Sequence, residues 1–279
     1  MAAISNQTRA ERVTVQLVLL ILAVVWLVPV AWMVVTSVKT TAEIFTLPLR
    51  WLPSAPTILN YETVIMRSNL LLWFMNSLII TGSQVVLTIV VSALAAYAFA
   101  RIRFPGRQIL FILVLTTLMI PGQVTLIPTY LIISRLGWVN TYQAAFVPEI
   151  GAAFGIFLLR QFFLGIPEEL EDSARIDGSG RFRMFLQIVL PMSIPAVAAL
   201  GIFTTINAWN NFLWPLIVLH DSTMMTLPVG LAMLQGTYAT SSYGVLMAAA
   251  TIASAPVLVV YIFFQRKIIQ GVSISGVLK

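Results

Sequence analysis

Long apolar segments separated by short polar ones dominate this sequence. A helix needs about 20 consecutive apolar residues to cross the ~30 Å hydrocarbon core of a bilayer. Six segments have that length, with charged residues or Pro and Gly at their ends. They are 13–38, 71–100, 108–134, 141–163, 194–219 and 243–264. The pattern predicts an all-α membrane protein with six transmembrane helices in a single transmembrane domain, residues 1–279.

The positive residues are unevenly distributed between the predicted loops. With six spans, both termini lie on the same side of the membrane. Twelve of the sixteen Lys and Arg residues fall on that side, and four fall on the other: Lys39, Arg50, Arg67 and Arg135. Because cytoplasmic loops are enriched in Lys and Arg, we expect both termini to be cytoplasmic in a multi-pass protein of a bacterial plasma (inner) membrane, in contact with lipid.

Composition supports the membrane assignment and excludes several classes of protein. Of the 279 residues, 59% are hydrophobic and 9% are charged, whereas soluble domains carry roughly 25% charged residues. The absence of Cys and the single His exclude disulfide frameworks, thiolate metal sites and His-rich metal sites, so no metal ligands are expected. No basic cluster is interleaved with aromatic residues, so nucleic acid is not an expected partner.

The internal loop 164–193 has a composition unlike the other loops. Five of the ten acidic residues lie between Glu168 and Asp177. Pro167 suits a helix start, carboxylates stabilise the first turn, and Gly178 suits a helix end. A second short helix is expected over 181–189. The sequence therefore predicts a short surface helix followed by a glycine hinge, although a solvated charged loop that only orients the protein has a similar composition.

The spacing within this loop resembles the EAA coupling loop of ABC importer permeases. That motif reads E-A-A, three residues, G, nine residues, I-x-L-P. Glu171 precedes the matching run, and both spacings fit without a gap, with Asp and Ser in place of the leading Glu and first Ala. The matching residues are Asp172, Ser173, Ala174, Gly178, Ile188, Leu190 and Pro191.

The resemblance extends over nearly the whole chain. The runs 96–101, 104–107 and 157–163, together with Trp209-Asn210 and Pro215-Leu216, look like carbohydrate-uptake permeases. The chain is most similar to the second permease subunit of maltose-type and glycerol-3-phosphate-type systems. This implies the type I ABC importer permease fold.

The resemblance also implies partners and a division of labour. Such permeases form a heterodimer with a second permease subunit, bind two ATP-binding subunits and receive solute from an extracytoplasmic solute-binding protein. Their coupling helix docks on an ATPase, where Glu171 and Asp177 are further candidate contacts. The chain contains no G-x-x-x-x-G-K-[ST] run. We therefore expect a transport subunit rather than an enzyme, with no catalytic residues and no cofactor in this chain, and with ATP and Mg on the partner ATPase.

Polar residues inside spans are candidates for the solute pathway, because they are costly in a bilayer. Glu149 lies about eight residues into the fourth span, beside Pro148. It is interpreted either as an acceptor for sugar hydroxyls or a contact between subunits, or as a residue at the outer interface or paired within the bundle. Gln84 is interpreted as a packing residue.

The fifth span contains a cluster of amides. Asn207, Asn210 and Asn211 have i, i+3 and i+4 spacing, which predicts one helix face, and Trp209 lies among them. Amides with an aromatic ring suit a polyol, although the same amides also stabilise contacts between helices.

These observations predict a permease subunit of an ATP-driven ABC importer for a carbohydrate or related polyol. One alternative is an ABC permease for another solute, such as glycerol phosphate or an amino acid. An ion-coupled secondary carrier is a second alternative, but it would require paired ionisable residues within the spans.

Overall fold

The computed structural model describes residues 9–151, 153–238 and 242–274, and these form an all-α fold without strands. The prediction of an all-α protein is confirmed for this part of the chain. The helices are α1 (Arg9–Ser37), α2 (Thr41–Ile44), α3 (Leu59–Arg67), α4 (Leu70–Arg101), α5 (Arg107–Thr116), α6 (Gly122–Arg135), α7 (Tyr142–Phe146), α8 (Ala153–Leu164), α9 (Glu168–Ile176), α10 (Arg181–Met184), α11 (Leu190–Met192), α12 (Ile194–Trp209), α13 (Leu213–Val218), α14 (Leu227–Tyr238) and α15 (Tyr243–Ile274).

Three helices in the described residues are long and apolar enough to cross a membrane by themselves. They are α1, α4 and α15. Three bent pairs of helices raise the number to as many as six if each pair is one span. The sharpest bend is 103°, between Arg107–Met119 and Gly122–Arg135, and another is 77°, between Arg181–Met192 and Ile194–Trp209.

Three predicted spans are not continuous helices, and one of them, 141–163, is interrupted between Glu149 and the start of α8 at Ala153. Segment 108–134 breaks before Pro121, because the residue preceding a proline is disfavoured in the helical region. Segment 194–219 breaks after Trp209. There the Asn210 side chain donates a hydrogen bond to the Ile206 carbonyl at 2.8 Å, a local interaction that competes with continuation of the helix.

The chain divides into two compact units. Unit 1 comprises residues 1–70 and 231–254, and unit 2 comprises residues 71–230 and 255–279. In unit 1, the buried Asn60 side chain donates to the carbonyls of Ser37 and Lys39, both at 2.8 Å. Lys39 is 1% exposed, and its ammonium group lies 4.4 Å from the centre of the Trp32 ring. These contacts fix α3 against the end of α1.

Unit 2 is built around α4, whose early residues bind the segment that leads into α14. The Trp73 indole donates to the Ser222 carbonyl at 2.7 Å, and the Ser77 hydroxyl accepts the buried Leu227 N–H at 2.8 Å. Further along, Tyr97 of α4 packs in a core with Leu159, Phe163, Phe185 and Leu200. In this core α8 packs against both α5 and α12.

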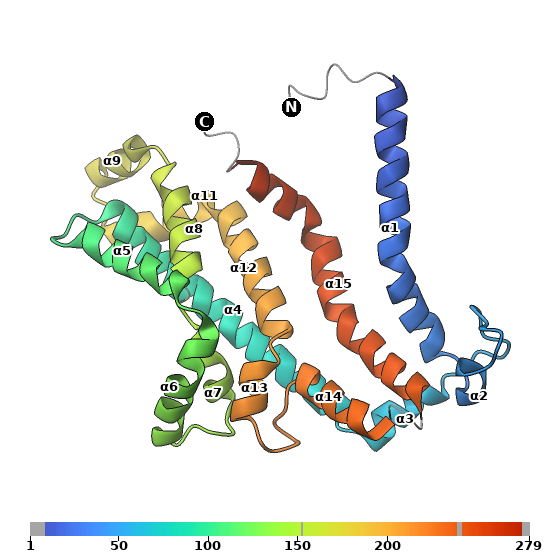
Figure 1. Cartoon of the computed structure of the whole chain (residues 1–279). Coiled ribbons are helices and arrows are strands. Elements are labelled where there is room, and N and C mark those ends of the chain that lie inside the picture. Colours follow the sequence, from blue (N-terminus) through green and yellow to red (C-terminus); the bar gives the residue numbers. More distant parts are fainter. Residues whose placement is uncertain (1–8, 152, 239–241, 275–279) are drawn as a thin grey trace. The chain divides into compact units, whose positions relative to one another are not determined.

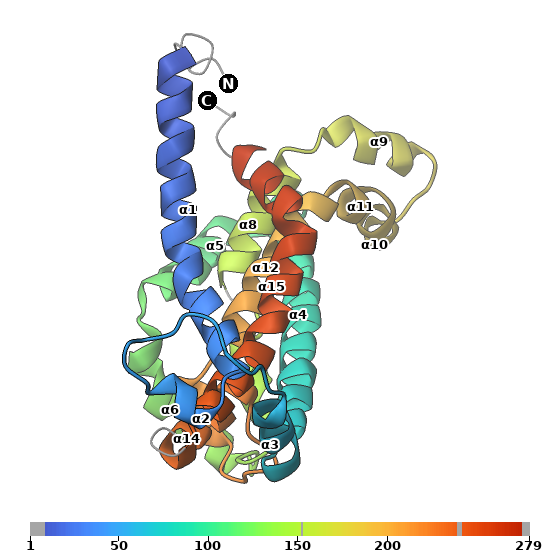
Figure 2. The same ribbon diagram turned by 90° about the vertical axis from the view of Figure 1, so that its right-hand side faces the viewer.

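The two ends of unit 2 differ in character. Helices α5, α9, α10 and α11 lie at one end, and α6, α7 and α13 lie at the opposite end (Figures 1 and 2). At the second end, Trp214 of α13 is buried and donates to the Ala144 carbonyl of α7 at 2.9 Å. The charged α9 segment and the end formed by broken helices are thus separated along the unit.

Candidate functional site

Three helix breaks in unit 2 contribute residues to the same pair of cavities. The breaks are the α5–α6 junction, the turn between α7 and α8, and the α12–α13 junction. Gln123, Glu149 and Asn211 come from these three breaks in turn, and all three line the same cavity. Irregular backbone at membrane depth is tolerated where it is buried in protein or lines an aqueous cavity. The breaks therefore mark a polar site within the predicted spans.

The larger cavity has a volume of about 370 Å³ and is enclosed by α4, α8 and α12. Its polar lining comes from Gln84 and Thr88 of α4, from Glu149, and from the end of α12. Two aromatic rings, Phe154 and Phe203, line it as well. The complete lining is Gln84, Thr88, Glu149, Phe154, Gly155, Leu200, Phe203, Thr204, Asn207 and Asn211.

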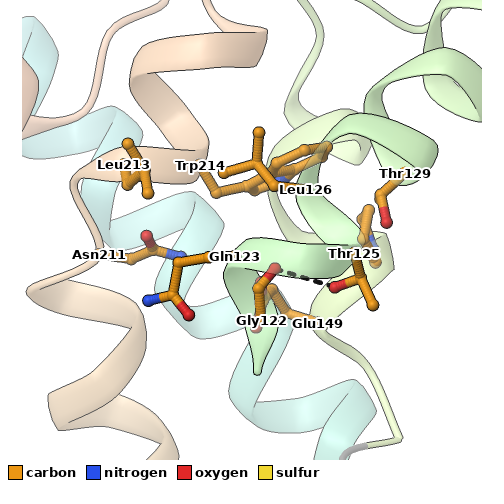
Figure 3. A pocket seen from close by; sticks show the side chains of 10 residues that line it. Gly122, Gln123, Thr125, Leu126, Thr129, Glu149, Asn211, Leu213 and Trp214 are labelled. Atoms are coloured by element: carbon orange, nitrogen blue, oxygen red, sulfur yellow. Dashed lines mark hydrogen bonds between the residues drawn. The ribbon is translucent and has the colours of Figure 1, made fainter. Parts of the chain in front are cut away.

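The smaller cavity has a volume of about 220 Å³ and lies against the start of α6 (Figure 3). It shares Glu149 and Asn211 with the larger cavity. Gln123 and Thr125 line it from α6, and Figure 3 shows the Thr125 hydroxyl directed back to the Gly122 carbonyl, at 2.9 Å. Glu149 and Asn211 therefore join two polar compartments.

The polar groups around the larger cavity are not all used within the protein. Thr88 is only 2% exposed, yet its hydroxyl has no hydrogen-bond partner in the described part of the chain. Glu149, Asn207 and Phe203 have exposed side chains. Glu149 is also the only charged residue among the described residues that line either cavity. The arrangement provides donors and acceptors to a polar ligand around a single carboxylate.

Three of the five residues predicted for a solute pathway meet here, namely Glu149, Asn207 and Asn211. The prediction that Asn210 shares a helix face with the other two amides is wrong, because α12 ends at Trp209 and the exposed Asn210 side chain caps it. Trp209 is also directed elsewhere. Its ring is buried and packs edge-on against Phe74, with centroids 5.6 Å apart.

Sequence reasoning missed the contribution of α4, α6 and α8 to this site. Gln84, interpreted as a packing residue, lines the larger cavity together with Thr88, one helical turn later. The i, i+4 spacing places these two polar residues on one face of α4, but the helix also contains Asn76, Ser77 and Thr81, so the spacing alone does not single them out. Gln123 had no local signal, because its position depends on the sharp bend before α6.

The predicted coupling loop forms the second site, at the opposite end of unit 2. Helix α9 begins at Glu168, after Pro167, and ends at Ile176, and Gly178 has a φ of +81°. This is the short helix and glycine turn that the sequence predicted. The left-handed conformation at Gly178 lets the Ser179 N–H reach the Ala174 carbonyl at 2.9 Å, which closes the helix.

One face of α9 is fixed to α4 by a buried ion pair. Glu171 Oε1 lies 2.7 Å from Arg101 Nε, and both side chains are 6% exposed. The Nε–H is not aligned with the carboxylate, so the contact is an ion pair rather than a linear hydrogen bond. The Tyr97 hydroxyl donates to the second Glu171 oxygen at 3.3 Å, and Arg101 also lies 3.3 Å from Glu168.

The other face of α9 is open. Asp172, Ser173, Asp177 and Gly178 are exposed, and Asp172 pairs at 2.7 Å with Arg175, an equally exposed neighbour. Ile176 is 88% exposed, an unusual position for a large apolar residue in a charged segment. The coupling-loop motif therefore has two parts. Glu171 is buried against α4, and the exposed surface presents Ile176 among charged residues.

The end of the motif continues into the next span. Ile188 lies in a π-helical turn, Phe185–Val189, and Leu190 and Pro191 lie in α11. The buried Ser193 then donates to the Val189 carbonyl at 2.7 Å. Pro191 is exposed, whereas Ile188 and Leu190 are half-buried. These residues shape the turn that leads from the α9 end of the unit into α12.

A basic concavity of about 710 Å³ lies between α9 and the α4–α5 connection. Five arginines line it, together with Glu168, Glu171 and Asp172; the arginines are Arg101, Arg103, Arg107, Arg175 and Arg181. Among the described residues there is no group of three or more His, Cys, Asp or Glu side chains able to hold a metal.

Comparison with known proteins gives this geometry a context. The family described as "Binding-protein-dependent transport system inner membrane component" matches residues 88–274. That range contains α9, the Arg101–Glu171 pair and most of the cavity lining.

Individual relatives match most of the chain. The arabinooligosaccharides transport system permease protein AraQ of Halalkalibacterium halodurans is 41% identical over 226 residues, 81% of each protein. AraQ of Bacillus subtilis is 34% identical over 277 residues, 98% of each. A chain in the crystal structure of a bacterial ABC transporter involved in the import of the acidic polysaccharide alginate superposes with a TM-score of 0.82 at 24% identity, covering 93% of this chain and 98% of that one. The likeness shows that the fold is that of an ABC importer permease.

Proposed function

Because the chain belongs to the family of binding-protein-dependent transport system inner membrane components, we propose that it is the membrane-spanning permease subunit of an ATP-driven importer for a carbohydrate or related polyol. Relatives named for arabinooligosaccharide transport support the solute class. The pair of cavities with amide, hydroxyl and carboxylate groups supports it independently, since sugar hydroxyls both donate and accept hydrogen bonds.

The observation on which this proposal chiefly rests is the two-faced construction of α9. Its inner face is fixed by the buried Arg101–Glu171 pair, while Asp172, Ser173 and the 88%-exposed Ile176 are free to meet another protein. We assign the outer face to an ATP-binding subunit. ATP and Mg bind on that partner, because this sequence lacks a P-loop.

Further partners follow from the same assignment. The apolar side chains of α1 are exposed along its length, with Trp26 78% exposed. Such a surface requires lipid or another apolar protein face. We assign it to the bilayer and to a second permease subunit, with a solute-binding protein on the outer side and both termini in the cytoplasm. The terminal residues 1–8 and 275–279 lie outside the described residues.

Affinity purification of the tagged chain in mild detergent tests the proposal. We expect a second multi-span protein and a P-loop ATPase, at one permease pair to two ATPases, and ATP hydrolysis that increases when the solute-binding protein is added. A chain that purifies alone or as a homo-oligomer under every gentle condition contradicts the proposal and favours an ion-coupled carrier instead.

A further inference from the structure

The two cavities of unit 2 are lined, in the described part of the chain, by polar groups without a positive charge. Their polar lining consists of amides, hydroxyls and one carboxylate, and no Lys or Arg is among the described residues that line them. We propose that the Glu149 cavities form a solute-binding site of this subunit that accepts neutral, hydroxyl-rich sugars and rejects anionic ones, with Glu149 as the specificity-determining residue. This proposal rests on the proposed transport function and adds the charge class of the solute.

The capacity to bind hydroxyls follows from the lining groups. Asn207 and Asn211 each offer a donor and an acceptor, and Glu149 offers acceptor oxygens. The Thr88 oxygen is closed off from the cavity in this structure, so the amides and the Glu149 carboxylate are the groups that a sugar hydroxyl can reach.

The aromatic residues of the larger cavity suit the apolar face of a sugar ring. Phe154 and Phe203 pack edge-on, with centroids 6.0 Å apart, and each remains 42% exposed. Their exposed ring surface can cover the C–H face of a sugar while the amides bind its hydroxyls. At about 370 Å³ the cavity lies in the range of small-molecule sites, which is roughly 300–1,000 Å³.

Exclusion of anions follows from the single carboxylate. A uronate or phosphate that enters must lose water without gaining a cationic partner, and it then lies close to a like charge. A site for an anion of this size normally contains Arg or Lys. The arginines that could bind an anion lie around α9, where they line a different concavity at the other end of the unit.

Direct binding to the purified importer complex separates this site from the selectivity of the binding protein. The probes are arabinotriose, which is neutral, and trigalacturonate, which is anionic, and the measurement is saturation-transfer NMR without the solute-binding protein. We expect wild type to prefer arabinotriose by about tenfold or more. Glu149→Gln should reduce this preference by about tenfold, whereas Glu62→Gln, which removes a carboxylate from an exposed position on α3, should leave it unchanged.

Two amide variants test where the sugar binds. Asn207→Ala should weaken arabinotriose binding by about fivefold, and Asn210→Ala, which alters an amide outside both cavities, should not. The proposal is overturned if wild type binds trigalacturonate as well as arabinotriose, if Glu149→Gln keeps the wild-type preference, or if neither probe binds. The ATPase content of the same preparation reports on the proposed function separately, so a complex that contains its ATPase but binds neither probe refutes only the site.

Discussion

The α9 end of unit 2 and the cavities at the helix breaks both place a carboxylate near α4, but they use it in opposite ways. Glu171 is 6% exposed on its side chain and is matched by Arg101 and Tyr97, so its charge is compensated within the chain. Glu149 is exposed to two cavities that contain no cation among the described residues, and the nearby Thr88 hydroxyl has no partner. A carboxylate that is paired within the chain, such as Glu171, fixes one helix to another. A carboxylate that faces a cavity without a cation, such as Glu149, is available to a ligand.

The largest effect on transport is expected at Gly178, in the exposed turn that follows α9. Gly178→Asp should abolish transport and reduce co-purification of the ATPase, because it adds a charge and a side chain to the exposed turn at a φ of +81°. No atom lies within 4 Å of the position that a Cβ would occupy, so the only strain comes from the backbone at this φ, and the variant should still insert into the membrane.

Gly180→Asp is the matched control for that variant. It adds the same charge two residues away, also with no atom within 4 Å, but at an ordinary φ of −74°. Transport assays on both variants, with immunoblots for membrane insertion, distinguish the two positions. Normal transport by Gly178→Asp contradicts the docking role of the outer face.

Removing the anchor carboxylate should be the most costly change for stability. Glu171→Ala removes the buried partner of Arg101 and leaves it only the exposed carboxylate of Glu168 at 3.3 Å; breaking a buried pair in this way typically costs about 3–5 kcal/mol. We expect a lower midpoint of thermal unfolding for the purified complex and loss of transport. Glu169→Ala, at an exposed position of the same helix, should leave the midpoint of thermal unfolding unchanged.

A double replacement shows whether the charge itself is needed. Arg101→Met combined with Glu171→Leu removes both charges, and apolar replacements of buried pairs are often neutral for stability. The double variant should recover thermal stability relative to Glu171→Ala. If Glu171→Ala is as stable as wild type, then the ion pair does not anchor α9.

A smaller effect is expected from crowding the wall of the larger cavity. A Cβ at Gly155 would lie 2.6 Å from the Ser92 hydroxyl oxygen and 3.1 Å from Leu200 Cδ1. Gly155→Ala should therefore force α8 away from α4 and α12 and destabilise the protein by about 1–3 kcal/mol. Gly82→Ala, where no atom lies within 4 Å, is the control, and adding Ser92→Ala should partly rescue Gly155→Ala in thermal unfolding.

The smallest effects compare two hydroxyls on α4. Ser77 accepts the buried Leu227 N–H, so Ser77→Ala should cost about 1 kcal/mol in unfolding free energy. Thr88→Val removes a buried hydroxyl without a partner in the described residues and should raise stability by about 1 kcal/mol. A large loss of stability in Thr88→Val would instead assign the hydroxyl a structural role.

Local patterns in the sequence predicted α9 well and its attachment poorly. Pro167, the acidic first turn and Gly178 are all local signals, and the helix follows them. Glu171 and Arg101 are separated by 70 positions (171 less 101), and no local periodicity indicates that they meet. The motif therefore identified the segment, while the division into an anchored face and an open face required the packed structure.

The cavity shows the same limit in a different form. Hydropathy identified the apolar segments, and intramembrane polarity selected Glu149, Asn207 and Asn211 as separate candidates, which the structure places around one cavity. Helical spacing failed at Asn210, because α12 ends at Trp209 and the Asn210 side chain bonds back to the Ile206 carbonyl. Gln123 enters the site only through the 103° bend before α6, which apolar content alone does not indicate.

The continuity of α4 has a mechanical consequence. Its 32 residues contain the anchor for α9 at Arg101 and the cavity wall at Thr88, about 20 Å apart at ~1.5 Å per residue, with no break between them. The remaining walls of the cavity come from shorter helices that begin or end near it. Helix α4 is therefore an unbroken connection between the anchor of α9 and the cavity wall, so a displacement of α9 would reach the cavity along one helix.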